Sequence, residues 1–174
     1  MTANVPLARD ASATGARTPE SWAMRPIDPG DGGFLDALYE TTRLEEVVAW
    51  GLAIDAARLF LAAQARTQRA GYAIQYPAAE HWALVTGGMR VGRLVLDVAG
   101  PAWRVVDLSV MPAHRERGLG TWALHYVQGR AKRAEAPVRL TVATSNPARR
   151  LYARLGFSVT SGDGEHLAME WRPR

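Results

Sequence analysis

A loop with two glycines, set between a predicted strand and a predicted helix, constrains this sequence more than any other feature. The strand covers residues 103–110 and ends before Pro112, and the helix covers residues 121–134. Gly118 and Gly120 stand where the loop meets the helix. Glycine lets the main chain approach a ligand closely, and the first turn of a helix offers unpaired N–H groups at its positive end. The segment therefore predicts a binding site for a diphosphate.

Two common phosphate loops do not fit this segment. A dinucleotide-binding loop carries a third glycine where this sequence has Ala123, and it needs an acidic residue about 20 positions further on, which is missing here. A Walker loop needs a Lys-Ser or Lys-Thr pair after its glycines, which is also missing. The pattern that does fit is R-x-x-G-x-G, from Arg115 to Gly120.

The charge distribution agrees with an anionic ligand. The 174 residues include 21 basic and 17 acidic ones, and Lys132 is the one lysine. Residues 112–156 hold nine basic and two acidic residues, so this stretch carries a net charge of +7. Arginine suits phosphate because its guanidinium donates two parallel hydrogen bonds. A polyanion bound by the C-terminal half and an ordinary solvated surface both explain this bias.

Composition excludes several classes of protein. The sequence has no cysteine, which excludes disulfide scaffolds, thiolate nucleophiles and cysteine-ligated metals. The four histidines show no metal-binding spacing, so we expect no metal. No apolar run approaches the roughly 18 residues that a membrane span needs, and residues 1–21 lack the apolar stretch of a secretory signal. We therefore expect a cytoplasmic protein that does not bind a membrane.

The chain is predicted to fold as one domain. Residues 1–21 have no apolar period and are predicted to form a flexible arm, and residues 22–174 are predicted to form the domain. Its N-terminal half starts with a short strand at residues 22–27, a turn at 29–33 and a helix from Phe34. A second helix is predicted over residues 55–73, with Asp55 as its N-cap. The expected apolar face of that helix consists of Leu59, Phe60, Ala63, Ala70 and Ile74.

The rest of the domain alternates strands and helices. Residues 81–86 and 90–98 are predicted to pair as a hairpin around Gly87-Gly88. After the glycine loop and its helix come a strand at residues 138–143 and a short helix from Asn146 to Leu155. A closing hairpin is predicted from residues 157–160 and 166–171.

Two motifs in order carry a resemblance to a known family. The first is Arg115 to Gly120 after a strand that ends in valine. The second is Asn146, then Leu151-Tyr152, then Gly156-Phe157, one strand downstream. Together they resemble the GNAT superfamily of acyl-CoA-dependent N-acyltransferases. The resemblance implies an α/β fold (α+β mixed), with a central mixed, mostly antiparallel sheet that is splayed between the fourth and fifth strands and flanked by about four helices.

The resemblance also implies an activity and its cofactor. An acetyl group would pass from acetyl-CoA directly to an amine of a small molecule or a protein. The backbone near Leu108 would polarise the thioester carbonyl, and Val110 would pair with the pantetheine amides. Asn146 would cap its helix or bind pantetheine, and Tyr152 would protonate the departing thiolate. The diphosphate would lie on the loop formed by Arg115, Glu116, Arg117, Gly118, Leu119, Gly120 and Thr121.

The general base is harder to assign. Asp107 is the one carboxylate on its strand, but strand alternation turns it away from the acceptor unless a bulge re-aims it. Arg104 and Val106 hold positions where some relatives carry acids. Glu40, Glu45 and Glu46 in the N-terminal helices, or a chain of water molecules, are the alternatives.

Two other functions compete with acyl transfer. A module that binds acyl-CoA without catalysis, such as a sensor, would explain the uncertain base. A nucleic-acid-binding module is disfavoured because the basic residues do not alternate with aromatic ones. A homodimer is compatible with such folds, but the residues do not indicate one.

Overall fold

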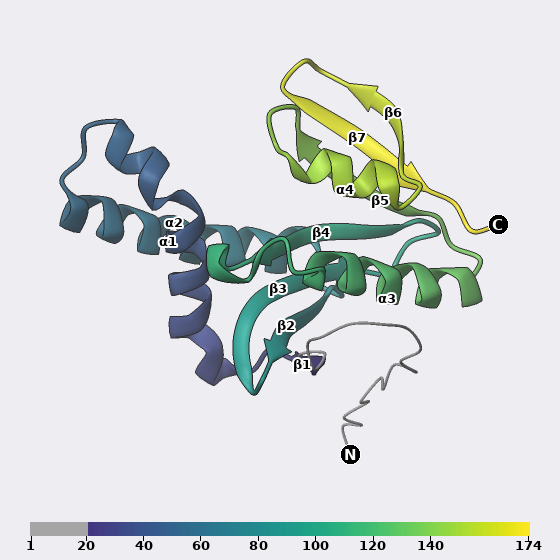
Figure 1. Ribbon diagram of the computed structural model, residues 1–174, viewed down its shortest axis with the longest axis horizontal. Helices are drawn as coiled ribbons and strands as arrows, with labels where there is room; N and C mark the ends of the chain where they lie inside the picture. Colours follow the sequence, from purple (N-terminus) through teal and green to yellow (C-terminus); the bar gives the residue numbers. More distant parts are fainter. Residues whose placement is uncertain (1–20) are drawn as a thin grey trace, which may run out of the picture.

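The computed structural model describes residues 21–174, which form one seven-stranded sheet flanked by helices (Figure 1). The strands are β1 (Trp22–Pro26), β2 (Glu80–Thr86), β3 (Met89–Asp97), β4 (Trp103–Val110), β5 (Val138–Ala143), β6 (Ser158–Gly162) and β7 (His166–Trp171). The helices of this part of the chain are α1 (Gly32–Ala49), α2 (Ile54–Gln75), α3 (Leu119–Arg133) and α4 (Ala148–Arg154), with 3-10 turns η1 (Pro29–Asp31) and η2 (Pro112–His114). The predicted fold class is confirmed.

The sheet is open between its fourth and fifth strands. Its order is β1-β2-β3-β4-β5-β7-β6, and β4 with β5 is its one parallel pair within the described residues. That pair keeps two register positions, Trp103 with Val138 and Arg104 with Arg139. Beyond Arg104 the two strands separate, as Figure 1 shows. The predicted splay is therefore confirmed, and it exposes one side of β4 along most of its length.

A bulge bends β4 next to this opening. Asp107 pairs with Val95, whereas Val105 pairs with the next residue of β3, Leu96, so Val106 is an extra residue in β4. An extra residue breaks the strict alternation of side chains and increases the local twist.

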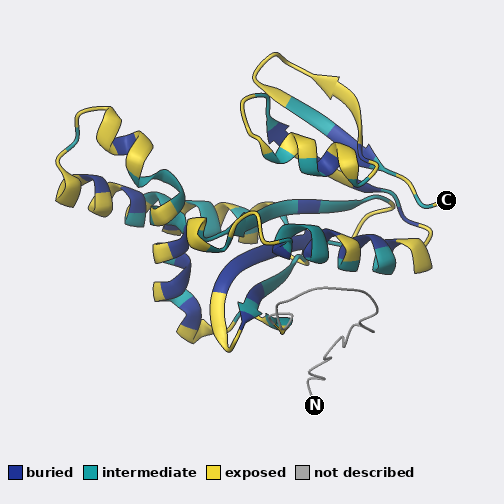
Figure 2. Ribbon diagram, in the orientation of Figure 1, coloured by how far each residue is buried: buried dark blue, intermediate teal, exposed yellow. Residues whose placement is uncertain are grey.

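The main core lies between the sheet and helices α3 and α4. Leu84 and Leu94 from the sheet meet Leu124 and Val127 of α3, and all four are fully buried (Figure 2). Burying a side chain of this size contributes about 1.5–3 kcal/mol. This packing fixes the position of α3 over the sheet, and with it the loop in front of α3.

Helix α2 covers the opposite face and differs from its prediction. Its N-cap is Ala53, and Asp55 lies inside the first turn without capping it. The buried residues are Ala57, Leu61 and Ala65, whereas the side chains predicted to be buried, Leu59 among them, face outward. Leu59 is 74% exposed. The prediction was wrong because the buried face of α2 is set by its contact with α1, where Ala57 and Leu61 pack against Val47.

The remaining sequence expectations concern the ends and the environment. The predicted arm falls almost entirely on residues 1–20, which lie outside the described residues. Across residues 21–174, no helix has the length and apolar character to cross a bilayer. The same part of the chain contains no cluster of three or more His, Asp or Glu side chains suited to a metal ion.

Candidate active site

The opening beside β4 leaves backbone groups unpaired. On one side β4 pairs with β3, with Leu108 opposite Leu94 and Val110 opposite Gly92. On the other side, within residues 21–174, no strand pairs with β4 after Arg104. No strand uses the N–H and C=O groups on that side, so they can pair with an extended ligand that carries amides of its own; among them, the carbonyl of Val110 already accepts from Arg115 Nε.

The loop after β4 ends in a cluster of unused backbone donors. Helix α3 begins at Leu119, and its N-cap Gly118 has a φ of +91° and provides no side-chain cap. Within the described chain, the N–H groups of Gly118, Leu119, Gly120 and Thr121 donate no hydrogen bond to the backbone, and the first bond of the helix runs from Trp122 N to Gly118 O at 2.9 Å. These donors and the positive end of a 15-residue helix together favour an anion.

The charged residues of the loop surround these donors. Arg115 Nε donates to the carbonyl of Val110 at 3.0 Å, which folds the arginine back onto the end of β4. Glu116 has a φ of +60°, which few residues other than glycine adopt, so the turn before Gly118 is tight. Arg115, Glu116 and Arg117 are exposed.

The two glycines of the motif meet different neighbours. A Cβ on Gly118 would come within 3.1 Å of Cη2 of Trp22, the first residue of β1. A Cβ on Gly120 would lie 3.5 Å from Leu151 Cδ2, which is an ordinary contact. Gly118 is thus required both by its positive φ and by the indole beside it, whereas Gly120 brings α4 alongside the start of α3.

Helix α4 places Tyr152 at the interior. The N-cap position of this helix is Pro147, which provides no side-chain cap, and Asn146 Oδ1 accepts a hydrogen bond at 2.9 Å from the N–H of Ala148, the first helical residue. Tyr152 is 8% exposed and packs edge-to-face on Phe157 at 5.9 Å between ring centroids. Within residues 21–174 the hydroxyl of Tyr152 has no hydrogen-bond partner, but it keeps contact with solvent. The Nδ1 atom of His114, in contrast, is both buried and without a partner. Burial, and secondly the charge of Asp107, raise the pKa of Tyr152 to about 12.

Asp107 lies beside the bulge and is held by its neighbours. Its Oδ2 accepts from Arg93 Nε at 2.7 Å and Nη2 at 2.6 Å, and its Oδ1 accepts from the hydroxyl of Ser109 at 2.8 Å. Arg93 Nη2 also donates to Gln68 Oε1 of α2 at 2.9 Å. The face of the sheet that carries Asp107 is therefore the one that α2 covers.

The other carboxylates considered as bases lie elsewhere. Glu40 is paired with Arg58 of α2 at 3.0 Å. Glu45 and Glu46 are exposed, near the end of α1 that extends away from the sheet in Figure 1. Arg104 reaches toward Thr141 of β5.

The partners of Asp107 were not predicted from the sequence. Arg93 is 6% exposed and lies 5.7 Å from the ring of Tyr72, a residue of α2. The available signal was an arginine in the middle of β3 among Val91, Leu94 and Val95, since a buried arginine needs a carboxylate partner.

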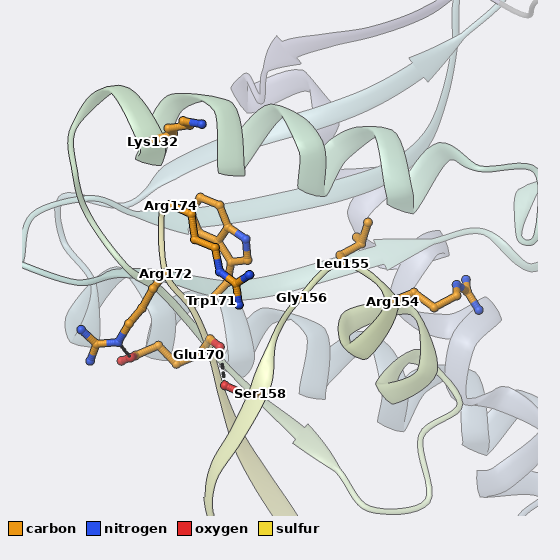
Figure 3. A pocket seen from close by; sticks show the side chains of 9 residues that line it. All are labelled: Lys132, Arg154, Leu155, Gly156, Ser158, Glu170, Trp171, Arg172 and Arg174. Carbon is orange, nitrogen blue, oxygen red and sulfur yellow. Dashed lines mark hydrogen bonds and ion pairs between the residues drawn. The ribbon is translucent and has the colours of Figure 1, made fainter.

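A second hollow lies away from this site. It has a volume of about 760 Å³ and is bounded by the ends of α3, α4 and β7. Its basic side chains, Lys132 and Arg154 among them, point in different directions in Figure 3, so they share no common centre. Glu170 is already paired with Arg139 and Arg172. Lys132 is about 18 Å from Gly120 along α3, given a rise of about 1.5 Å per residue.

Comparison with known proteins gives one family. The model of the acetyltransferase (GNAT) family matches residues 20–157. No curated protein matches the sequence.

Several solved structures share the fold at low sequence identity. The N-acetyltransferase PaiA of Thermoplasma acidophilum, solved in complex with coenzyme A, is 16% identical with a TM-score of 0.68, covering 87% of this chain and 99% of that chain. An acetyltransferase from Thermus thermophilus is 20% identical with a TM-score of 0.63, covering 88% of this chain and 97% of that chain. A GNAT family acetyltransferase from Elizabethkingia anophelis with acetyl-CoA bound is 16% identical with a TM-score of 0.50, covering 56% of this chain and 79% of that chain.

Proposed function

Because this chain belongs to the acetyltransferase (GNAT) family, we propose that it transfers the acetyl group of acetyl-CoA directly to the amine of an acceptor. The observation that carries the proposal is the row of unused N–H groups from Gly118 to Thr121, next to the open side of β4. A diphosphate on that row and an extended arm in that opening are two parts of one ligand, an acyl-CoA. The complexes of similar structures with coenzyme A and acetyl-CoA support this ligand.

The loop would hold the donor by its diphosphate. The amides of Gly118, Leu119, Gly120 and Thr121 would donate to phosphate oxygens, and Arg115 and Arg117 would add charge at the edge. The pantetheine arm would continue along β4, where Val110 would pair with its amides and Asn146 would contact it from the turn before α4. Backbone donors near Leu108 would then polarise the thioester carbonyl.

Tyr152 would act on the sulfur. The amine nitrogen attacks the carbonyl carbon, the C–S bond breaks, and its electron pair goes to the sulfur. A phenol with a pKa of about 12 is a weak acid beside a thiol of about 8.5, so full proton transfer to the thiolate would be uphill by about 5 kcal/mol. Tyr152 therefore stabilises the developing thiolate chiefly as a hydrogen-bond donor.

Asp107 would act on the amine. Its Oδ2 is occupied by Arg93, but its Oδ1 accepts one bond from Ser109 and has capacity for another. We assign Asp107 two roles. Its negative charge attracts the ammonium group of the acceptor, and its carboxylate accepts a proton from that group and passes it to water. The acceptor's identity, a cytoplasmic location and a homodimer stay predictions.

The test is turnover of acetyl-CoA with a panel of amines, measured by the release of the free thiol of coenzyme A. We expect Tyr152→Phe to lower kcat by about 100-fold while the Kd for acetyl-CoA stays within about twofold, because the phenol acts only as charge develops on sulfur. The matched control is Tyr76→Phe, which removes a hydroxyl at the end of α2.

Unchanged kcat in Tyr152→Phe would remove Tyr152 from the mechanism. Tight binding of coenzyme A with no turnover across the whole panel would contradict acetyl transfer and indicate a sensor.

A further inference from the structure

A tryptophan from the first strand lies against the phosphate loop. Trp22 begins β1 and pairs with Thr86 of β2, so the sheet fixes its backbone. Its ring meets Gly118, where a Cβ would come within 3.1 Å of Cη2, 3.9 Å of Cζ3 and 4.0 Å of Cζ2. Three atoms of one indole edge therefore face the position that a Cβ on Gly118, the N-cap of α3, would occupy.

A second tryptophan completes this contact. The rings of Trp22 and Trp122 meet edge-to-face, with centroids 6.1 Å apart and planes at 60°. Trp122 also donates its backbone N–H to the carbonyl of Gly118 at 2.9 Å. Gly118 is thus held on one side by the ring of Trp22 and on the other by the first hydrogen bond of α3.

The position of Gly118 determines where the four N–H groups point. Its φ of +91° is one of many conformations open to glycine. If the loop sampled those alternatives before binding, the cost of ordering it would weaken the affinity for the ligand.

We propose that Trp22 is a positioning residue of the phosphate loop, which holds Gly118 in its left-handed conformation and so preorganises the amides for the diphosphate of acyl-CoA. This inference rests on the proposed function. Trp22 supplies shape alone, so its loss should weaken binding of the donor and leave the chemical step unchanged.

The test is Trp22→Leu, with Trp50→Leu as a matched control because Trp50 is 60% exposed at the end of α1. We expect the Kd for coenzyme A to rise about tenfold, or about 1.4 kcal/mol, with kcat at saturating acetyl-CoA within about twofold of the parent. The Kd of Trp22→Phe should lie between those of the parent and Trp22→Leu. This variant keeps an aromatic ring, so it serves as the test if the leucine variant folds poorly. Without ligand, the ¹⁵N amide signal of Gly118 should broaden in Trp22→Leu and not in Trp50→Leu; a shift without broadening is expected from the lost ring current alone.

An unchanged Kd, with a Gly118 signal that stays sharp in Trp22→Leu and Trp22→Phe, would overturn the inference. So would a kcat that falls as much as the affinity. If the parent protein itself fails to bind coenzyme A, the proposed function fails, and the Gly118 signal still tests whether Trp22 orders the loop.

Discussion

Asp107 and Tyr152 come from different elements, and the charge of the first affects the proton of the second. Burial is the larger cause of the raised pKa of Tyr152, and the carboxylate of Asp107 adds to it because a nearby negative charge disfavours phenolate. The carboxylate beside the bulge and the phenol of helix α4 are therefore within electrostatic range of each other.

The coupling gives a prediction for Asp107→Asn. Removing the negative charge stabilises the phenolate, so the pKa of Tyr152 should fall below about 12 and stay above the ordinary value of about 10, because burial remains. A titration of ¹³Cζ-labelled tyrosine by NMR measures this value, with Glu40→Gln as the control. A Tyr152 pKa that does not move in Asp107→Asn would show that the two groups are not coupled.

At the residue scale the sequence was informative about types and weak about orientation. Tyr152 and Asn146 could be assigned by resemblance, but Asn146 stands one residue before the N-cap position of α4, which is Pro147, and bonds the N–H of Ala148 there. The direction of Asp107 could not be predicted, because it depends on the extra residue Val106, which exists only in the pairing of β4 with β3. Its partner Arg93 was missed for the same reason, since the contact joins two strands.

At the scale of elements, Arg130 fastens the last turns of α3 to the sheet. It donates two hydrogen bonds to Glu80 of β2 and lies 5.2 Å from the ring of Trp103 and 5.7 Å from that of Tyr126. The side chains of Arg130 and Glu80 are 23% and 28% exposed. Removing Arg130 leaves the partly buried carboxylate of Glu80 without its counter-ion, with the Nε1 donor of Trp82 at 3.1 Å as its remaining partner among the described residues.

This clamp predicts a loss of stability on mutation. Arg130→Met should lower the free energy of unfolding by about 2 kcal/mol, less than for a fully buried pair because solvent screens part of the charge. Arg58→Met is the matched control. The side chains of Arg58 and its partner Glu40 are 52% and 31% exposed, so the expected loss of unfolding free energy is below about 1 kcal/mol. Urea unfolding measures both, and equal losses would show that the clamp contributes nothing of its own.

Most elements were predictable because their local signals agree. Strand β4 and the helix after the glycine loop form where β-branched runs, proline and glycine predict them. The face of α2 was not predictable, because Ala57, Leu61 and Ala65 are buried by a neighbouring helix that does not appear in the periodicity of α2 itself.

At the scale of the whole molecule, the site exists because two parts of one sheet separate. Strands β1 to β4 form one part, β5 to β7 form the other, and two register positions join them. Helix α3 packs on the first part, and α4 approaches its N-terminal end through Leu151 and Gly120. Strand order and splay came from the resemblance to a family, because no local pattern determines which strands become neighbours.

The binding of coenzyme A to ¹⁵N-labelled protein tests the central claim most directly, with pantetheine, which lacks the diphosphate, titrated in parallel. The account predicts that the amide signals of Gly118, Leu119, Gly120 and Thr121 shift most with coenzyme A and far less with pantetheine. Equal shifts with both ligands, or the largest shifts at the hollow between the ends of α3, α4 and β7, would contradict it.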